Sequence, residues 1–333
     1  MKKTFALFGA GRIGRIHAAN IAAHAGARLK YVVDVDATAA AGIASAAGAT
    51  VADGKSVLAD AAVDALLVAS PTDTHADLIE AGAAAGKAIL CEKPVDLDVA
   101  RARAAVAAAE RAGILLAIGF NRRYDPSFRR IRQGIDAGEI GAVESVLIVS
   151  RDPSPPPIAY VQRSGGLFRD MTIHDLDMAR WLLGEEPVEV TAHGSCLVDP
   201  AIGAAGDIDT AAVTLRTARG RIAQVANTRR AVFGYDQRIE VCGARGMLAA
   251  GNRKSTSVER ATAAGYATDP ALPFFLERYA EAYRLELDAF VRRLHGGAAD
   301  IVSGGDGVRA LEIADACDKS LRTRATVLLE TRA

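Results

Sequence analysis

The chain has 333 residues, half of them hydrophobic, and its 40 basic residues balance 40 acidic ones. This length predicts two domains, and a balanced charge without long runs of either sign argues against a nucleic-acid or membrane-surface partner. The four cysteines are widely spaced and fit free thiols in a reducing compartment. Since we recognise neither an export signal nor a stretch of membrane-spanning length, we expect a cytoplasmic protein.

The first third alternates short apolar runs with Ala-rich amphipathic segments. The apolar runs are continuous and predict buried strands at 4–8, 29–35, 64–70, 87–93 and 114–120. Helices are predicted between them at 13–24, 37–47, 74–85 and 97–112. This alternation is typical of a parallel α/β sheet covered on both faces. It ends at 120–126, so we predict a first domain of residues 1–121 and a second of residues 122–333.

A glycine motif follows the first predicted strand directly. Gly9, Gly11 and Gly14, in the sequence GAGRIG, open the next predicted helix. Glycines at this spacing permit a tight turn and let backbone N–H groups approach a pyrophosphate at the helix N-terminus. We expect this motif, including Arg12 and Ile13, to bind a dinucleotide; by itself it also fits an ordinary glycine-rich turn.

Asp34 closes the second predicted strand, twenty positions after Gly14. A carboxylate there accepts hydrogen bonds from an adenosine ribose diol and repels a 2′-phosphate, which favours NAD over NADP. A turn residue at a strand end is the alternative interpretation. Arg12 and Lys30 are nearby cations that can tolerate a phosphate.

A polar loop follows the predicted strand that ends at Ser70. Ligands of such folds gather at the carboxyl ends of the strands, so we expect Ser70, Thr72 and His75 to contact the cofactor. Simple helix initiation, with Asp73 or Thr74 as the N-cap, is the alternative.

Glu92 and Lys93 end the next predicted strand, just before Pro94. A lysine facing the ligand crevice can donate to a substrate oxygen as a compact charge. We expect Lys93 to contact cofactor and substrate, and Glu92 to contact the cofactor. The alternative is a surface ion pair between Glu92 and Lys93, with Pro94 in the first turn of a helix.

The sequence pattern changes after residue 126. A strand at 144–150 precedes the proline-rich stretch 151–160, which cannot be helix interior or central strand. Further strands are predicted at 188–198, 209–217, 221–230 and 237–243, with a hairpin turn at 218–220. Several of them alternate apolar and polar residues, which indicates a mostly antiparallel sheet with one open face. Helices are predicted at 274–295 and 304–321.

The segment 165–184 begins with two glycines, Gly165 and Gly166, and predicts a helix directly after them. Asp170 and His174 are four residues apart, so they lie on one stripe of an α-helix. A carboxylate beside an imidazole fixes its tautomer and raises its basicity, which prepares a general base. An alternative is that Asp170 caps the helix while His174 makes a local surface pair.

Together these motifs resemble the glucose–fructose oxidoreductase and inositol dehydrogenase superfamily. The residues that carry the resemblance are GAGRIG, Glu92-Lys93-Pro94, GFNRRYDP at 119–126, and Asp170 with His174 after the two glycines. Segments 165–182 and 234–248 are most similar to bacterial inositol 2-dehydrogenases. The resemblance spans nearly the whole chain. It implies an N-terminal Rossmann domain and a C-terminal α+β domain whose open-faced, mostly antiparallel sheet forms oligomer contacts, and we expect a homotetramer.

The resemblance also implies roles for single residues. It identifies Lys93, Asp170 and His174 as catalytic, and adds Arg123, Asp152 and Tyr235 as polyol contacts. Family members often have Asn in place of Asp152, and some inositol enzymes have His in place of Ser150. These departures concern the identity of the substrate more than the type of reaction.

The implied reaction is the NAD-dependent oxidation of myo-inositol to 2-keto-myo-inositol (scyllo-inosose). His174 takes the hydroxyl proton, Asp170 orients it, Lys93 holds the reacting oxygen, and NAD accepts the hydride. No metal is expected, because the set contains a single histidine. A related sugar or scyllo-inositol dehydrogenase is an alternative, and a non-catalytic NAD-binding regulator is an alternative of another class.

Overall fold

The computed structural model describes residues 1–330, and the chain divides into two compact units. The first unit contains Met1–Tyr124 and Ala282–Leu311. The second contains Asp125–Glu281 and the segment from Glu312 onward. Residues 282–311 therefore return to the first unit after the chain has built most of the second.

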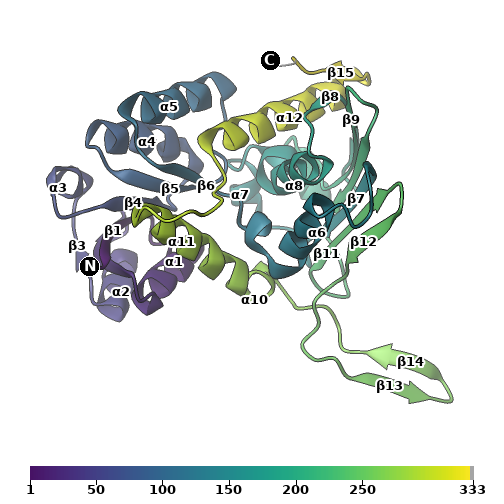
Figure 1. Cartoon of the computed structure of the whole chain (residues 1–333), viewed down its shortest axis with the longest axis horizontal. Coiled ribbons are helices and arrows are strands. Elements are labelled where there is room, and N and C mark those ends of the chain that lie inside the picture. Colours follow the sequence, from purple (N-terminus) through teal and green to yellow (C-terminus); the bar gives the residue numbers. More distant parts are fainter. Residues whose placement is uncertain (331–333) are drawn as a thin grey trace. The chain divides into compact units, whose positions relative to one another are not determined.

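The first unit is built on a six-stranded sheet in the order β3-β2-β1-β4-β5-β6, and each neighbouring pair is parallel (Figure 1). Its strands are β1 (Lys3–Phe8), β2 (Ala27–Val33), β3 (Thr50–Val51), β4 (Ala65–Val68), β5 (Ala88–Glu92) and β6 (Leu116–Gly119). This is the strand order of a Rossmann fold, with a topological switch between β1 and β4. The predicted parallel sheet is confirmed; only the two-residue β3 is missing from the prediction.

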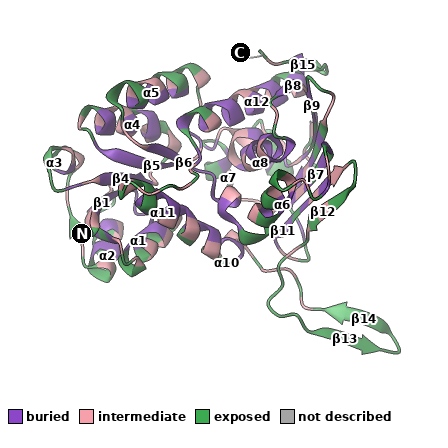
Figure 2. Cartoon of the chain, in the orientation of Figure 1, coloured by how far each residue is buried: buried purple, intermediate pink, exposed green. Residues whose placement is uncertain are grey.

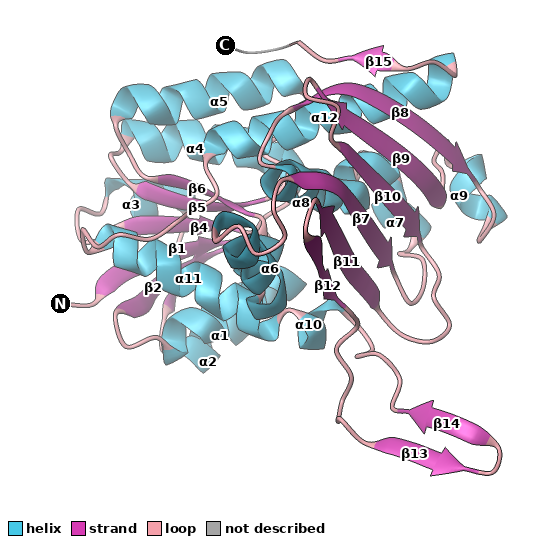
Figure 3. Ribbon diagram, turned by 45° about the vertical axis from the view of Figure 1, so that its right-hand side comes forward, coloured by secondary structure: helices cyan, strands magenta, loops and turns pink. Residues whose placement is uncertain are grey.

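Helices cover this sheet (Figure 3). They are α1 (Arg12–Ala23), α2 (Ala37–Ala47), α3 (Gly54–Ala59), α4 (His75–Ala84), α5 (Val99–Ala112) and α11 (Ala280–Leu294), with short 3-10 turns η1 (Thr72–Thr74) and η2 (Asn121–Tyr124). Local sequence sets the ends of α2, because the Asp36 carboxylate accepts the N–H groups of Thr38 and Ala39 and Gly48 takes a left-handed conformation with φ 66°. From α11, Leu287 and Phe290 enter the core beneath β1.

The second unit is built on a seven-stranded sheet in the order β12-β11-β7-β10-β9-β8-β15. Its strands are β7 (Val143–Arg151), β8 (Pro187–Ser195), β9 (Thr210–Thr217), β10 (Ile222–Thr228), β11 (Asp236–Gly243), β12 (Gly246–Ala250) and β15 (Val327–Leu328). Within this sheet, among the described residues, only the pairing of β7 with β10 is parallel. The predicted mostly antiparallel sheet and the hairpin turn at 218–220 are confirmed.

This sheet has one covered and one open face. Along β9, Val213 and Leu215 are buried, whereas Ala212 and Thr214, which alternate with them, are exposed. Figure 2 shows the chain coloured by this burial. Alternation of buried and exposed side chains is typical of a strand with one face on the core and the other in solvent. Helix α8 (Ile173–Leu183) lies against β7 and β10 on the covered face.

The second unit contains further helices, of which α7 (Ile158–Val161), α9 (Pro200–Ala204) and α10 (Phe275–Arg278) have four or five residues. The others are α6 (Pro126–Asp136) and the later part of α12 (Gly304–Thr323), with a π-helical turn, η3 (Phe168–Thr172), just before α8. A separate hairpin, β13 (Glu259–Thr262) with β14 (Gly265–Thr268), projects from the end of the sheet (Figure 3). Within residues 1–330, every helix is too short or too polar to cross a membrane.

Candidate functional site

The glycine motif forms the turn between β1 and α1. Gly9 has φ 104°, and a Cβ there would lie 2.4 Å from backbone atoms of Ala69 after β4. A Cβ on Gly14 would lie 2.0 Å from the Gly9 carbonyl oxygen, so the packing of the protein itself requires both glycines. Gly11 differs, because a Cβ there would meet no atom of the described residues within 4 Å. This open backbone at the start of a helix fits the close approach of a pyrophosphate.

The Asp34 carboxylate lies beside this turn. Its Oδ2 accepts the Ala10 N–H at 2.5 Å and its Oδ1 accepts the Asp36 N–H at 2.8 Å. These bonds hold the carboxylate at the end of β2 beside the glycine turn. The sequence predicts that the pyrophosphate binds at this turn and that the adenosine ribose binds to Asp34. Arg12, which opens α1, and Gly11 are exposed next to it, and Ile13 is half-buried.

The loop after β4 is tied together by its polar side chains. The hydroxyls of Ser70 and Thr74 lie 2.6 Å apart, and Thr74 also donates to the Pro71 carbonyl at 2.7 Å. Thr74 is the N-cap residue of α4, but its side chain makes no capping bond. His75 is buried, and its ring nitrogens lie 2.7 Å from the Pro94 carbonyl and 2.9 Å from that of Ser70. Half-buried Thr72 lies in the same turn.

Glu92 and Lys93 are located where β5 ends. Oε1 of Glu92 lies 2.8 Å from Nε2 of His17 on α1, and the Lys93–Pro94 peptide is cis. Helix α5 begins only at Val99, so Pro94 does not start a helix. A Cβ on Gly119 would lie 2.9 Å from Oε2 of Glu92, and this glycine therefore makes room for the carboxylate.

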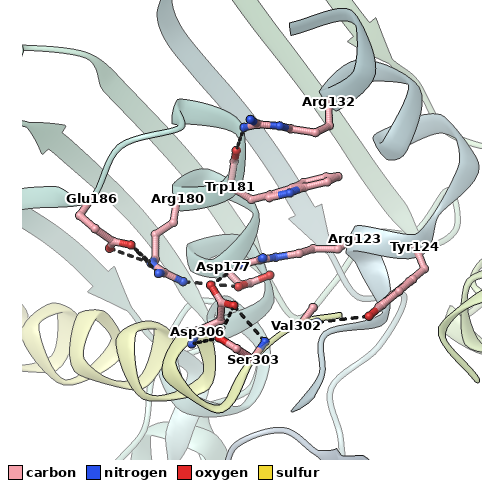
Figure 4. A network of polar contacts seen from close by, with 10 residues as sticks. All are labelled: Arg123, Tyr124, Arg132, Asp177, Arg180, Trp181, Glu186, Val302, Ser303 and Asp306. Atoms are coloured by element: carbon pink, nitrogen blue, oxygen red, sulfur yellow. Dashed lines mark hydrogen bonds and ion pairs between the residues drawn. The ribbon is translucent and has the colours of Figure 1, made fainter. Parts of the chain in front are cut away.

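Arg123 also belongs to the first unit, in η2. Its Nη2 lies 3.0 Å from Oδ1 of Asp306 in the first turn of α12, and Asp306 also accepts the N–H and hydroxyl of Ser303 (Figure 4). The side chain of Arg123 is 14% exposed. The sequence pattern did not reveal Asp306, whose only local signal is a serine three positions earlier.

In the second unit, the two glycines shape the approach to the helix that carries Asp170 and His174. Gly165 and Gly166 have φ of 83° and 84°, and a Cβ on Gly166 would lie 2.9 Å from Oδ1 of Asp207. The same Asp207 oxygen accepts the Leu167 N–H at 3.0 Å. Positive φ at both positions explains why this approach contains glycines.

Asp170 lies in the π-helical turn η3, and His174 lies in the first turn of α8. The expectation of a continuous α-helix through Asp170 is wrong, because α8 begins at Ile173. The alternative in which Asp170 caps the helix is also wrong: the N-cap of α8 is Thr172, and no side chain makes the cap. Single π-helical turns next to α-helices occur frequently at functional sites.

The carboxylate of Asp170 is held by groups from two other elements. Its Oδ1 accepts the Tyr160 hydroxyl at 2.7 Å, and its Oδ2 lies 3.1 Å from Nη2 of Arg229. Nη1 of Arg229 lies 3.8 Å from Oδ2 of Asp152. Tyr160 is 47% exposed, but partial desolvation of its hydroxyl and the negative charge of Asp170 raise its pKa, so it stays a neutral donor.

Buried polar contacts fix the segment that carries His174. Asn227 on β10 accepts the Thr172 hydroxyl at 2.7 Å and donates to Asp175 at 2.8 Å, so it holds the residues on both sides of His174. Further along α8, Arg180 pairs with Asp177 and Glu186, and the carbonyl of Trp181 accepts Arg132 from α6 (Figure 4). These contacts tie α8 to the sheet and to α6.

Ser150 and Tyr235 both make contacts with side chains of the second unit. Ser150 is fully buried, and its hydroxyl lies 2.9 and 3.1 Å from the amide group of Gln237. Gln237 also accepts the Tyr279 hydroxyl at 3.0 Å. Tyr235 is buried and packs edge-on against the rings of Phe274 and Tyr279.

Of the site residues that the sequence suggests, the first unit carries the glycine motif, Asp34, Ser70, Thr72, His75, Glu92, Lys93 and Arg123. The second unit carries Asp152, Asp170, His174 and Tyr235, and within it Arg229 joins Asp152 to Asp170. Sequence analysis missed Tyr160, Asn227 and Arg229. Only Arg229 had a local signal, since it is one of two basic residues at the end of the strand predicted at 221–230.

Two family models match the chain in succession. The model described as "Oxidoreductase family, NAD-binding Rossmann fold" matches residues 3–120, and the model "GFO/IDH/MocA C-terminal domain" matches residues 128–249. Together they cover the six-stranded sheet with its glycine motif and most of the second sheet.

The chain is also similar to known proteins over almost its full length. It is 51% identical to an inositol 2-dehydrogenase of Rhizobium meliloti, over 98% of this chain and 99% of that one. It is 43% identical to a myo-inositol 2-dehydrogenase of Thermotoga maritima, over 97% and 98% of the two chains.

Solved structures show the same likeness. A putative myo-inositol dehydrogenase from Sinorhizobium meliloti superposes with a TM-score of 0.96 at 50% identity, covering 99% of this chain and 100% of that one. A scyllo-inositol dehydrogenase from Lactobacillus casei, with bound NAD(H) and scyllo-inositol, superposes with a TM-score of 0.91 at 29% identity, covering 98% and 99%.

Proposed function

Because the chain belongs to the GFO/IDH/MocA oxidoreductase family, whose N-terminal domain is an NAD-binding Rossmann fold, we propose that it is an inositol 2-dehydrogenase. The reaction is the oxidation of myo-inositol to 2-keto-myo-inositol (scyllo-inosose) with NAD. The observation that carries the proposal is the Asp170 carboxylate in η3, which is held in place by Tyr160 and Arg229 and lies four residues before His174 in the first turn of α8. The high identity to inositol 2-dehydrogenases supports the choice of substrate.

In this proposal, cofactor binding belongs to residues 1–121. The pyrophosphate lies on the turn formed by Gly9, Gly11, Arg12, Ile13 and Gly14, and Asp34 accepts hydrogen bonds from the adenosine ribose. The remaining cofactor contacts come from the carboxyl ends of β4 and β5, through Ser70, Thr72, His75, Glu92 and Lys93. Residues 122–333 bind the substrate and form the oligomer.

Oxidation of a secondary alcohol removes a proton from oxygen and a hydride from the same carbon. His174 accepts the hydroxyl proton, and Asp170 orients the imidazole and stabilises the imidazolium that forms. Lys93 donates to the reacting oxygen and stabilises its developing negative charge. NAD, when bound, supplies the hydride acceptor. Arg123, Asp152 and Tyr235 contact the other hydroxyls of the polyol.

Two alternatives compete with this reaction. A scyllo-inositol or sugar dehydrogenase of the same family would use the same proton chemistry, and the likeness to the Lactobacillus casei enzyme favours scyllo-inositol as the second candidate substrate. A non-catalytic NAD-binding regulator would need the glycine turn but not the pair of Asp170 and His174. The ordered support around Asp170 argues against a regulator.

We further propose a homotetramer that is located in the cytoplasm. The open face of the second sheet exposes apolar side chains, among them Leu147 at 40% exposure and Met247 at 53%. Symmetric self-association would cover such a face. The four cysteines are free thiols, and two of them, Cys91 and Cys317, are buried, which suits a reducing compartment.

A panel of inositols and sugars, each offered with NAD⁺ and with NADP⁺, tests the proposal. Absorbance of the reduced cofactor reports turnover. We expect the highest kcat/KM with myo-inositol and NAD⁺. A preference for scyllo-inositol or a sugar would select the first alternative, and NAD binding without turnover of any polyol would select the regulator.

A further inference from the structure

Arg229 is a buried cation between two carboxylates of the second unit. Its side chain is only 2% exposed, and its two terminal nitrogens lie 3.1 Å from Oδ2 of Asp170 and 3.8 Å from Oδ2 of Asp152. Its Nε is buried and finds no hydrogen-bond partner within residues 1–330. A guanidinium this deeply buried is stable only when it is paired, so these carboxylates account for its position.

The register of two parallel strands creates this arrangement. Arg151 at the end of β7 lies opposite Thr228 at the end of β10, so the next residues, Asp152 and Arg229, leave the sheet side by side. The backbone is fixed there, because the Asp152 N–H donates to the Thr228 carbonyl and the Arg229 N–H donates to the Asp209 carbonyl, both at 2.9 Å. The carboxyl edge of these strands thus presents a carboxylate and a guanidinium together.

The charges around Asp170 show what Arg229 contributes. Tyr160 from α7 is a neutral donor, Asp152 follows β7, His174 lies on α8, and Arg229 follows β10. Arg229 is a permanent cation within 4 Å of both carboxylates. Without this cation, two half-buried carboxylates would lie in the same region, and one of them would take up a proton more readily.

We propose that Arg229 is a positioning residue, which keeps Asp170 ionised and in one orientation by pairing with it and with Asp152 at once. Only an ionised Asp170 can orient the imidazole of His174 and stabilise its imidazolium, so Arg229 supports proton transfer without touching the substrate. This inference rests on the proposed function of Asp170 and His174. It also assigns Asp152 an indirect part in catalysis, through Arg229.

The test uses the full-length enzyme with NAD⁺ and myo-inositol, and compares R229Q, D152N and the double variant R229Q/D152N. Loss of a group that orients a functional side chain typically costs about 10–100-fold in activity, so we expect R229Q to lose that much in kcat with a smaller change in KM. The acid limb of its pH–rate profile should move to higher pH. In the double variant, removal of the second carboxylate should restore part of kcat and move the acid limb back.

Arg230, the next residue, provides the matched control. It is exposed, with one long contact of 3.4 Å to the Val198 carbonyl, and R230Q should leave kcat and the pH profile unchanged. Circular dichroism checks folding. If R229Q does not fold, R229K replaces it. Lysine keeps the positive charge but lacks the two terminal nitrogens that pair with both carboxylates, so kcat should fall while the acid limb of the pH–rate profile stays in place.

The outcomes separate this inference from the proposed function. Wild-type protein that turns over no polyol contradicts the proposed function. Wild-type protein that oxidises myo-inositol, together with folded R229Q of unchanged kcat and pH profile, contradicts only the role of Arg229. Equal losses in R229Q and R229Q/D152N would also contradict it, because the proposal requires the two residues to be coupled.

Discussion

Nε2 of His17 lies 2.8 Å from Oε1 of Glu92, the residue that immediately precedes Lys93. His17 is on α1, directly after the glycine turn, so this bond links the predicted cofactor loop to the strand end that carries Lys93. A third ionisable group, Glu286 on α11, is buried in the same unit. Burial, and then the negative charge of Glu92, raise the pKa of Glu286 well above its usual range.

Glu286→Gln should make stability less dependent on pH. In the unfolded chain Glu286 ionises near its ordinary pKa of 4.5, whereas in the folded protein it keeps its proton to a much higher pH. The unfolded state therefore releases a proton first, and the contribution of Glu286 to stability falls as the pH rises above 4.5. Glutamine does not titrate, so the variant should gain stability relative to wild type by at most about 1.4 kcal/mol per pH unit in this range.

Thermal unfolding between pH 5 and pH 9 measures this difference. Glu281→Gln is the matched control on the same helix, since Glu281 is 40% exposed and pairs with Arg253 at the surface. Its Tm difference from wild type should vary little with pH. A Glu286→Gln difference that is constant over the whole range would mean that Glu286 is ionised in the folded protein.

Asp34→Ala should weaken NAD binding and narrow the preference for NAD over NADP. The substitution removes the ribose contacts and the repulsion of a 2′-phosphate. KM values for both cofactors measure the effect. Asp36→Asn is the control. Asp36 lies two positions after Asp34, and its side chain caps the N-terminus of α2. A wild-type enzyme that uses NADP as well as NAD would contradict our interpretation of Asp34.

Leu147→Arg should weaken the proposed tetramer. Leu147 is 40% exposed on the open face of β7, where a charged side chain costs little in a monomer but opposes an apolar contact between copies. Light scattering coupled to gel filtration gives the mass of wild type and variant. A wild-type monomer at micromolar concentration would remove the proposal of self-association.

The fold could be predicted where burial leaves a pattern in the sequence. Apart from the two-residue β3, the parallel strands of the first unit lie in continuous apolar runs, and each was found from that property. The hairpin of β13 and β14 was missed because its strand residues are all exposed, so no alternation marks them. Helix α6 was missed because residues 120–126 were interpreted as the end of a domain, although Asp125 caps a helix that starts at Pro126.

The site could be predicted in part, for the same physical reason. Asp170 and His174 are close in sequence, and the two preceding glycines mark an unusual backbone. Arg229 lies far from both in sequence, and its contact with Asp152 depends on the parallel register of β7 and β10. A single sequence indicates strands but does not specify which of them are neighbours, so this contact could not be derived without the structure.

The most direct prediction concerns His174 itself. His174→Ala should lose turnover by about 10²–10⁴-fold, the loss expected for a missing acid–base group. Asp170→Asn should also be damaging, because an amide cannot stabilise the imidazolium and leaves Arg229 without one of its carboxylates. The wild-type oxidation rate should rise with pH as His174 becomes neutral, since only the neutral imidazole accepts a proton. Steady-state kinetics with myo-inositol and NAD⁺ measure these effects.

Binding of NAD separates the catalytic interpretation from a structural one. Both side chains act on the polyol in our proposal, so the Kd for NAD should change far less than kcat in either variant. His193→Ala on β8 is the matched control, because His193 is exposed in the same unit and should leave kcat unchanged. If His174 made only a surface pair, its loss would cost a few tenths of a kcal/mol in stability and leave activity intact. Folded His174→Ala with near wild-type turnover would therefore contradict the catalytic assignment, whereas folded protein that binds NAD but has lost turnover would support it.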